Sequence, residues 1–233
     1  MNSISIVLPV HNERDNLEKL ISSWNSTLTS EKVDHEFILV EDGSTDGTKE
    51  LIVKLEKEYP ITNLSQSKKR GYSLAVIEGI YCAKKDYILC TDSDNQIKVS
   101  SLVENLNKFP KVNEFLIGYR NPRNDPINRL IYSKLFKIFH DLIFKSKLKD
   151  PSCPFVIGMK ESFLKLDKNK MLYMKEGFWW GFIGVCKIQK CFIKQVPIDH
   201  YKRETGQAGY KIKDLPGIIF RNIVGILKIK YLN

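Results

Sequence analysis

The segment YILCTDSDNQ, residues 87–96, joins a short apolar run to a cluster of polar side chains. Asp92, Asp94 and Gln96 occupy alternate positions directly after that run. A buried strand ending here would place these side chains outside the carboxyl edge of a parallel sheet, where open α/β folds bind ligands. Their oxygens suit Mg²⁺ or Mn²⁺, which keep waters and share their coordination shell with substrate phosphates. Taken alone, the triplet is more typical of a surface turn, because Asp, Ser and Asn are common turn residues.

The first hundred residues favour the first interpretation, because strand-like apolar runs alternate there with helical patterns. Strands are expected at residues 3–10, 37–40, 61–64 and 87–90, with a helix in each connection. This alternation is typical of βαβ units with right-handed crossovers, so we predict an α/β fold with a mostly parallel sheet flanked by helices. Each strand ends in polar residues that should meet at one edge of the sheet. The residues expected to converge there are Glu13, Asp42, Arg70, Asp92 and Asp94.

The second half of the chain is less regular. Strands are expected at residues 116–120, 155–159 and 191–198, and a helix at residues 176–190. Residues 125–149 predict one long helix or a bent pair, which Pro151 and Pro154 end. The apolar periodicity from residue 214 predicts a further helix. We therefore expect one domain over residues 1–212 and an amphipathic helical tail over residues 213–233.

Composition limits the class of protein. The chain has 233 residues, of which 42% are hydrophobic, enough for a sizeable core. The sequence shows no apolar run of membrane-spanning length, and residues 1–3 lead into the first strand without a signal-like segment, so we expect a cytoplasmic protein. The five cysteines have no metal-binding spacing, and in a reducing compartment they are expected to be free thiols.

The net charge of +10, from 37 basic and 27 acidic residues, indicates an anionic partner: a phosphate ligand, a lipid surface or nucleic acid. Because the basic residues are dispersed and the expected site is acidic, a nucleic-acid-binding module is disfavoured. Residues 127–142 and 215–227 combine apolar stripes with Lys and Arg. Such helices lie in the headgroup plane of a membrane or pack on the protein's own core, and the pattern leaves both alternatives open.

Several segments resemble motifs of the family 2 glycosyltransferases, which have the GT-A fold, a Rossmann-like nucleotide-sugar-binding fold. The principal ones are VLPVHNE at residues 7–13, VEDGSTDGT at residues 40–48 and DSDNQ at residues 92–96. KRGYSLA at residues 69–75, IGYR at residues 117–120, Asp150-Pro151, and VPI at residues 196–198 with Arg203 and Gly206 after it also fit. Each motif is weak by itself, but their occurrence in the right order over nearly the whole chain forms a specific signal. The dolichol-phosphate mannosyltransferase and polyprenyl-phosphate glycosyltransferase branch is the most similar.

This resemblance implies metal-dependent, inverting transfer of a hexose from a GDP- or UDP-linked sugar to a polyprenyl phosphate, with peripheral contact at the cytoplasmic face of a membrane. It implies Mg²⁺ or Mn²⁺ held by Asp92, Asp94 and Gln96. It assigns catalytic roles to Asp94, Arg120 and Arg203, the two arginines as phosphate ligands. The donor-binding positions that it implies are Pro9, His11, Glu13, Val40, Asp42, Arg70, Asp92, Ser93 and Arg129.

The acceptor decides the subclass. A lipid phosphate is already anionic and needs no general base, whereas a sugar hydroxyl needs a positioned carboxylate or His. Relatives that act on hydroxyls carry an acid in the helix that here begins EGFWWGF, residues 176–182, where only Glu176 is available. This favours a phosphate acceptor. Ala208 and Gly209 replace the Ser-Lys usual in prenyl-phosphate enzymes, so a sugar hydroxyl of a polysaccharide or glycolipid stays open, as does a non-catalytic sugar-nucleotide binder.

Overall fold

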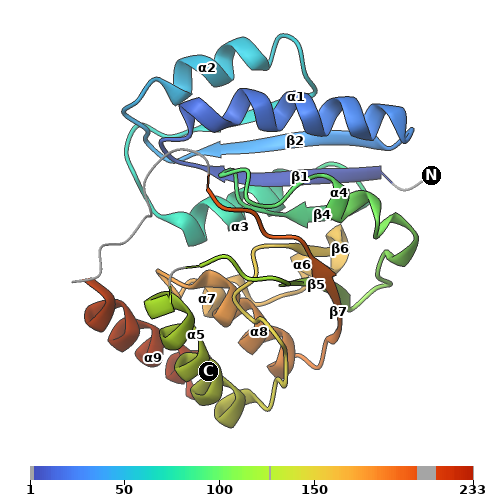
Figure 1. Cartoon of the computed structure of the whole chain (residues 1–233). Coiled ribbons are helices and arrows are strands. Elements are labelled where there is room, and N and C mark those ends of the chain that lie inside the picture. The colour runs from blue at the N-terminus through green and yellow to red at the C-terminus, as the bar shows by residue number, and fades with distance from the viewer. Residues whose placement is uncertain (1–2, 126, 204–213, 233) are drawn as a thin grey trace.

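The computed structural model describes residues 3–125, 127–203 and 214–232 (Figure 1). A seven-stranded sheet with the order β3-β2-β1-β4-β6-β5-β7 forms its centre. Only β6 runs against its neighbours, so the prediction of a mostly parallel sheet is confirmed. The strands are β1 (Ser3–Val10), β2 (Asp34–Glu41), β3 (Ile61–Ser65), β4 (Tyr87–Cys90), β5 (Glu114–Arg120), β6 (Val156–Met159) and β7 (Phe192–Ile198).

Helices cover both faces of the sheet. Along β2, Phe37 and Leu39 pack in the cluster with α1, whereas Ile38 and Val40 pack in the cluster with α3. Successive strand side chains point to opposite faces, so a continuous apolar run fits a sheet buried on both sides. The helices are α1 (Arg14–Ser30), α2 (Thr48–Leu55), α3 (Tyr72–Cys82), α4 (Ser100–Val103), α5 (Ile127–Phe144), α6 (Lys160–Leu164), α7 (Lys168–Met171), α8 (Phe178–Ile188) and α9 (Leu215–Tyr231).

The strand order fixes where a ligand can bind. β1 pairs with β2 on one side and with β4 on the other, and all three are parallel. The chain therefore reverses its direction of winding between β1 and β4. Open α/β sheets bind ligands in the crevice outside the carboxyl ends of the strands at such a switch point. The loops that leave β1 at His11 and β4 at Thr91 form this crevice.

The second half of the chain builds a helical layer from α5, α8 and α9, which lie together in Figure 1. The predicted C-terminal helix is present as α9, but it is integrated into the fold: Ile226 and Ile229 are fully buried in the core cluster that contains α8. Among the described residues, no helix has the length and apolarity needed to span a membrane. All five cysteines are free thiols, as expected.

His140 of α5 lies in this layer with its ring wholly buried, which gives a pH-dependent prediction. Its Nε2 is 3.0 Å from the carbonyl oxygen of Trp180, and its Nδ1 is 3.2 Å from the hydroxyl of Ser146. Burial lowers the pKa of His140 from 6.5 to about 4, against the opposing influence of the Trp180 carbonyl. Below pH 6.5 the unfolded chain therefore binds a proton that the folded chain does not, and the free energy of unfolding should fall between about pH 6.5 and pH 4.

The expected loss attributable to His140 reaches about 3 kcal/mol, and it can be measured by urea unfolding across this pH range. His140→Gln should flatten the pH dependence. Asp141, Lys137 and Lys187, which also act on this ring electrostatically, remain in the variant. The pKa of His200 is lowered to about 4 as well, so the difference between parent and variant isolates the share of His140. Equal slopes in the two proteins would show that His140 carries no such linkage.

Candidate active site

The loops after β1 and β4 are tied together at the switch point. The Ser93 hydroxyl donates to the carbonyl oxygen of Pro9 at 2.7 Å, and the Thr91 N–H donates to the carbonyl oxygen of Val7 at 3.1 Å. These two hydrogen bonds hold the segment at residues 91–96 beside the segment at residues 9–13. The predicted convergence of the two motifs is therefore observed.

Glu13, Asp94 and Arg203 meet at this edge. The Arg203 guanidinium forms an ion pair with Glu13, whose other carboxylate oxygen accepts a hydrogen bond from Asn16 at 2.7 Å. Burial raises the pKa of Glu13, hydrogen bonding to Asn16 and the charge of Arg203 lower it, and the negative charge of Asp94 raises it again. Asp94 is thus close enough for its charge to act on Glu13. The positive charge of Arg203 offsets the negative charges of these carboxylates.

The segment after β7 returns across this edge, as the trace after β7 shows in Figure 1. Gln96 and Tyr201 are joined twice: the Tyr201 N–H donates to the Gln96 carbonyl, and the Gln96 side-chain amide donates to the Tyr201 carbonyl, both at 2.9 Å. This contact fixes the chain at Tyr201, two residues before Arg203, so that the Arg203 side chain reaches Glu13. His200 is held by the Asn124 N–H, which donates to its Nδ1 at 3.2 Å, so it has a structural partner.

Asp92 is oriented from the opposite side by two aromatic side chains. The hydroxyl of Tyr72, at the start of α3, donates to Asp92 Oδ1 at 2.7 Å. The Trp179 indole N–H, from α8, donates to the same hydroxyl at 2.9 Å. Burial and the charge of Asp92 raise the pKa of Tyr72 well above its ordinary value, so this phenol stays protonated and keeps donating. The α8 helix is therefore coupled to Asp92 through Tyr72.

The donor set at this edge fits a divalent cation that prefers oxygen. Asp92 and Asp94 offer carboxylates, and Gln96 is pinned beside them with its amide N–H donated to Tyr201. Within the described ranges, no three His, Cys, Asp or Glu side chains are grouped to hold a metal ion. Two carboxylates and an amide suit Mg²⁺ or Mn²⁺, which complete their shell with waters and phosphate oxygens, and not a closed structural zinc site.

A second loop borders the site at residues 68–71. Asp42 accepts hydrogen bonds from the backbone N–H groups of Arg70 at 2.6 Å and Gly71 at 2.8 Å, and so fixes this loop to the end of β2. Gly43 makes the approach possible: its φ is +70°, and a Cβ there would lie 2.5 Å from the backbone of Lys68. Asp42 therefore positions the loop at residues 68–71 beside the site, in addition to any contact with a donor.

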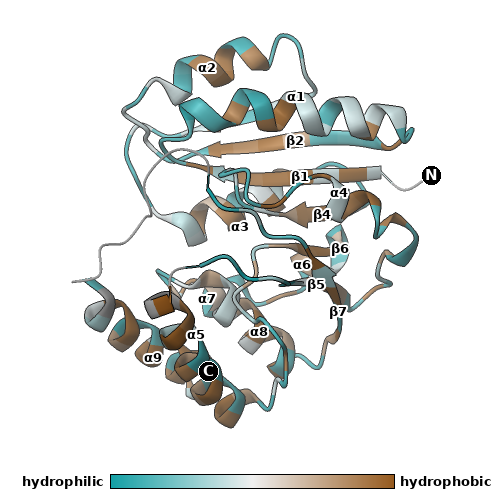
Figure 2. Cartoon of the chain, in the orientation of Figure 1, coloured by the Kyte–Doolittle hydropathy of each residue, from teal (hydrophilic) through white to brown (hydrophobic). Residues whose placement is uncertain are grey.

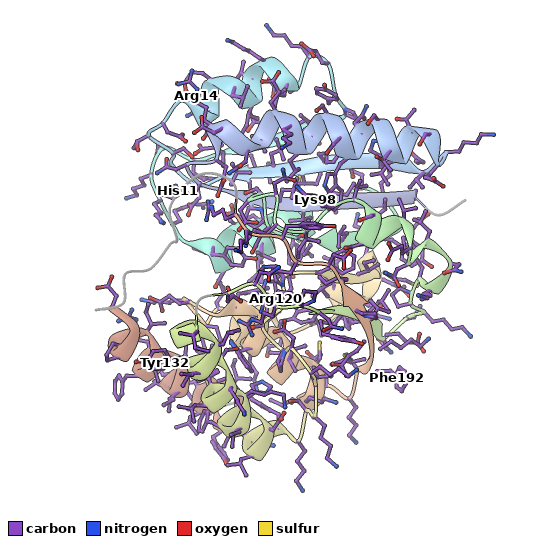
Figure 3. The ribbon with its side chains drawn as sticks, viewed as in Figure 1. His11, Arg14, Lys98, Arg120, Tyr132 and Phe192 are labelled. Carbon is purple, nitrogen blue, oxygen red and sulfur yellow. The ribbon has the colours of Figure 1, made fainter. Side chains whose placement is uncertain are left out.

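Buried polar atoms without a protein partner gather at the same edge. His11 Nδ1, Glu41 Oε2 and Thr91 Oγ1 have no hydrogen-bond partner among the described residues, and they lie at or directly after the ends of β1, β2 and β4; a fourth such atom, Trp24 Nε1, lies in α1. Buried polar groups are normally satisfied, so a cluster of unsatisfied ones at a strand edge is a place for a ligand or water. This supports the predicted position of His11, which Figure 3 labels.

Three of the predicted donor-binding residues have other roles. Val40 has 0% exposure and its side chain packs in the core between β2 and α3, so its predicted role in donor binding could involve only its backbone and stays a prediction. The guanidinium of Arg70 pairs with Glu78 of α3, and only its backbone borders the site. The Ser93 hydroxyl is used by the Pro9 carbonyl. The side chain of Arg129, and the positions Gly206, Ala208 and Gly209, lie outside the described residues.

Arg120, predicted to bind a phosphate, forms a buried ion-pair network instead. Its Nε lies 2.6 Å from Asp150 Oδ2, its Nη2 lies 2.9 Å from Asp150 Oδ1 and 2.8 Å from Ser152 Oγ, and its Nη1 lies 3.6 Å from Asp125 Oδ2. Its side chain is 5% exposed, in the interior of the molecule (Figure 3). Because every guanidinium nitrogen has a protein partner, the assignment of Arg120 as a phosphate ligand is wrong for this conformation; it fixes the loops after β5 and before β6.

Several residues of the site were missed from the sequence: Tyr72, Trp179, Asn16 and Tyr201. Tyr72 stands in the quoted KRGYSLA motif, and Trp179 in EGFWWGF, but nothing in either segment indicates that they meet at Asp92. Asn16 offered a local signal, since it lies three residues after Glu13 at the start of a helix, a spacing at which side chains are neighbours.

Solved structures identify the class of fold. The chain is similar to glucosyl-3-phosphoglycerate synthase from Mycobacterium tuberculosis, with a TM-score of 0.70 at 17% identity, covering 100% of this chain and 81% of that one. The same synthase was also solved in complex with Mn²⁺, uridine diphosphate and glucosyl-3-phosphoglycerate. Mannosyl-3-phosphoglycerate synthase from Rubrobacter xylanophilus gives a TM-score of 0.67 at 14% identity, covering 97% of this chain and 73% of that one. The fold is therefore the GT-A fold, as predicted.

The sequence comparison then identifies the family. The profile described as "Glycosyl transferase family 2" matches residues 5–167, and the chain belongs to this family. It is 30% identical to a dolichol-phosphate mannosyltransferase of Pyrococcus furiosus over 91% of this chain and 60% of that protein. It is 24% identical to an undecaprenyl-phosphate 4-deoxy-4-formamido-L-arabinose transferase of Salmonella choleraesuis over 94% of this chain and 66% of that protein. The chain thus spans roughly three fifths to two thirds of these relatives.

Proposed function

We propose that this chain is a metal-dependent inverting glycosyltransferase that moves a hexose from a nucleotide-diphosphate sugar to a polyprenyl phosphate. The observation that carries the proposal is the proximity of Asp94 to the Glu13–Arg203 pair at the switch point of the sheet, with Asp92 two residues before it and oriented by Tyr72. Family membership and the Mn²⁺ and uridine diphosphate of a structural neighbour support the same chemistry.

The donor diphosphate lies against Asp92, Asp94 and Gln96. A bound Mg²⁺ or Mn²⁺ supplies Lewis acidity that stabilises the departing diphosphate. Tyr72 and Trp179 keep the Asp92 carboxylate in one orientation, so little reorganisation is needed when the donor arrives. Glu13 holds Arg203 over the site, where its guanidinium can exchange the carboxylate for a phosphate oxygen.

A small cationic cavity supports a phosphate acceptor. It has a volume of about 160 Å³ and is lined by Arg123, Lys134, Lys137 and Lys149, of which Arg123 is paired with Asp125 and Lys137 with Asp141. This is below the range typical of pockets for whole ligands and suits a single anionic group. The cavity is also lined by Asp150, which pairs with Arg120, and by Trp180, which follows Trp179 in the chain. Polyprenyl phosphates appear in the names of both relatives above.

The position of Glu176 disfavours a hydroxyl acceptor. The Glu176 carboxylate is engaged by the Arg221 guanidinium of α9 at 2.8 Å, so the acid at the start of the α8 segment is committed to an ion pair. A phosphate acceptor needs no base, whereas a sugar hydroxyl would. Peripheral contact with the cytoplasmic face of a membrane belongs to the same proposal, since a polyprenyl chain is held in lipid.

The test is a donor screen over UDP-, GDP- and dTDP-sugars, with undecaprenyl phosphate, an oligosaccharide or 3-phosphoglycerate as acceptor. One donor should give a glycosylated prenyl phosphate with inverted anomeric configuration, and chelation of divalent metal should stop the reaction. Transfer to the oligosaccharide alone would replace the acceptor assignment. Absence of both transfer and donor hydrolysis with every metal would contradict the proposal.

Removing the Tyr72 hydroxyl is expected to weaken metal-dependent nucleotide binding. Tyr72→Phe deletes the donor to Asp92 and leaves the ring in place, and partners in such outer positions typically contribute 10- to 100-fold in metal affinity. We expect about a tenfold higher Mn²⁺ concentration for half-maximal thermal stabilisation by UDP or GDP. Tyr81→Phe, at an exposed site on the same helix, is the matched control. Identical Mn²⁺ dependence of Tyr72→Phe and parent would show that Asp92 needs no such support.

A further inference from the structure

Five aliphatic side chains of α5 form an exposed stripe. The exposed fractions are 72% for Ile127, 53% for Ile131, 60% for Leu135, 53% for Ile138 and 75% for Leu142. Their spacings of four, four, three and four residues place them within about 80° of one helix face, at roughly 100° per residue. Single exposed aliphatics are ordinary, whereas a continuous row along an 18-residue helix marks an interaction surface.

The opposite face of α5 already packs on the protein. His140 is fully buried against Trp180, and Phe136, Phe139 and Ile143 pack against the core cluster that contains α8. The sequence left open whether the apolar pattern of this helix faces the core or a membrane. In the structure the apolar residues of α5 lie on two faces. The face with the aromatic residues and His140 forms core contacts, and the aliphatic stripe faces outward. Within the described residues, the stripe contributes nothing to the core.

The surroundings of the stripe are basic. Lys134 is exposed beside it on α5, and Lys145, Lys147 and Lys149 are exposed where the chain leaves this helix. The neighbouring helix α9 carries Lys228 and Lys230, together with Arg221, which is paired with Glu176, and it has no acidic residue of its own. Figure 2 shows brown, apolar residues along both α5 and α9, on the side away from α1 and α2. Phe220 and Tyr231 of α9 are each 68% exposed, and Tyr132 of α5, labelled in Figure 3, is 38% exposed.

Charge decides between a membrane and a second copy of the chain. A two-fold dimer through this face would set the same basic patch against itself, and like charges across an interface oppose association. An anionic lipid surface complements the patch, and the aliphatic side chains can enter the boundary between headgroups and acyl chains. No described helix can span a membrane, so contact through these residues is interfacial.

We propose that the stripe of Ile127, Ile131, Leu135, Ile138 and Leu142 docks α5 in the headgroup plane of an anionic membrane. This rests on the proposed function in one respect, namely that the acceptor is held in lipid. Lys134 and Lys137 of the same helix line the cationic cavity, so docking brings that cavity to the level of lipid phosphates. The stripe supplies the anchor, and the cavity receives the phosphate of the acceptor.

The test is sedimentation of the whole chain with vesicles that contain no polyprenyl phosphate. One set is phosphatidylcholine alone, and the other contains about 30% phosphatidylglycerol, an anionic lipid. The parent should bind the anionic vesicles and release at high salt. Leu135→Glu with Ile138→Glu should weaken binding at least about tenfold. Val53→Glu, at a 43% exposed aliphatic on α2 at the other end of the molecule, should bind like the parent (Figure 1).

Both variants should hydrolyse donor in solution like the parent, because neither change touches the switch-point site; this separates docking from the proposed reaction. The milder pair Ile131→Gln and Leu142→Gln checks the result if the glutamate pair unfolds. Failure of the parent to bind anionic vesicles, or equal binding by the stripe variants, would overturn the proposal. A parent that is dimeric in solution and becomes monomeric in the stripe variants would assign the face to a second copy instead.

Discussion

Asp94→Asn is expected to lower sugar transfer by at least about a hundredfold and to abolish the metal-dependent stabilisation by nucleoside diphosphate. Asp94 is one of two carboxylates at the switch point, and its charge already acts on Glu13. Asparagine keeps the size of the side chain and an oxygen that can accept from the Gln96 N–H, a contact of 3.2 Å. The change therefore removes charge and leaves the local turn in place, so the unfolding temperature without ligand should hardly move.

Asp34→Asn is the matched control for this experiment. Asp34 starts β2, at the opposite end of the strands from the site, and pairs with Lys85 at 2.7 Å on the surface. Exposed pairs contribute little to stability, so this variant should transfer sugar and respond to metal like the parent. If Asp94→Asn retained metal-dependent nucleotide binding, the assignment of the metal to Asp92 and Asp94 would be incorrect.

Asp150→Asn is expected to destabilise the fold by about 3–5 kcal/mol, because it removes the nearer counter-charge of the buried Arg120 guanidinium and leaves only Asp125, at 3.6 Å. Arg120 holds the pKa of Asp150 at about 2, so the pair's contribution is present above the ordinary carboxyl pKa and is lost as the pH falls from about 4 to about 2. Urea unfolding at neutral pH should show a lower midpoint with an unchanged slope. The unfolding temperature should fall by roughly 6–20 °C.

The double variant Arg120→Met with Asp150→Leu tests whether the buried charge of Arg120, and not the loss of the Asp150 contacts, causes the destabilisation. Replacing both partners with apolar side chains should recover most of the lost stability, since no poorly compensated guanidinium charge is then buried at this position. Asp34→Asn serves again as the surface control and should change stability little. An Asp150→Asn protein as stable as the parent would mean that the ion pair with Asp150 does not hold Arg120 in place. Arg120 would then again be a candidate phosphate ligand.

The sheet and the centre of the site were predictable from local patterns. The strand at residues 87–90 and the alternation of strands and helices before it follow from short-range composition, and the parallel sheet then places Glu13 near Asp94 by topology. What failed depends on contacts between distant residues. Arg120 meets Asp150 across 30 positions, and Tyr72 meets Trp179 across 107. Periodicity carries no information about such pairs.

The amphipathic helix shows a different limit. Its apolar residues predicted one stripe, but α5 has apolar side chains on two faces, and only packing against α8 distinguishes them. Burial of Val40 could have been expected by the same argument. In a strand covered on both sides, position next to a motif does not decide which side chains reach the ligand.

A calorimetric titration of UDP and GDP into the chain, with Mn²⁺ and again with a chelator, tests the metal assignment to Asp92 and Asp94 most directly. We expect one of the two diphosphates to bind only when Mn²⁺ is present. Equal binding with and without metal, or no binding of either nucleotide, would contradict a cation held between Asp92, Asp94 and a donor diphosphate.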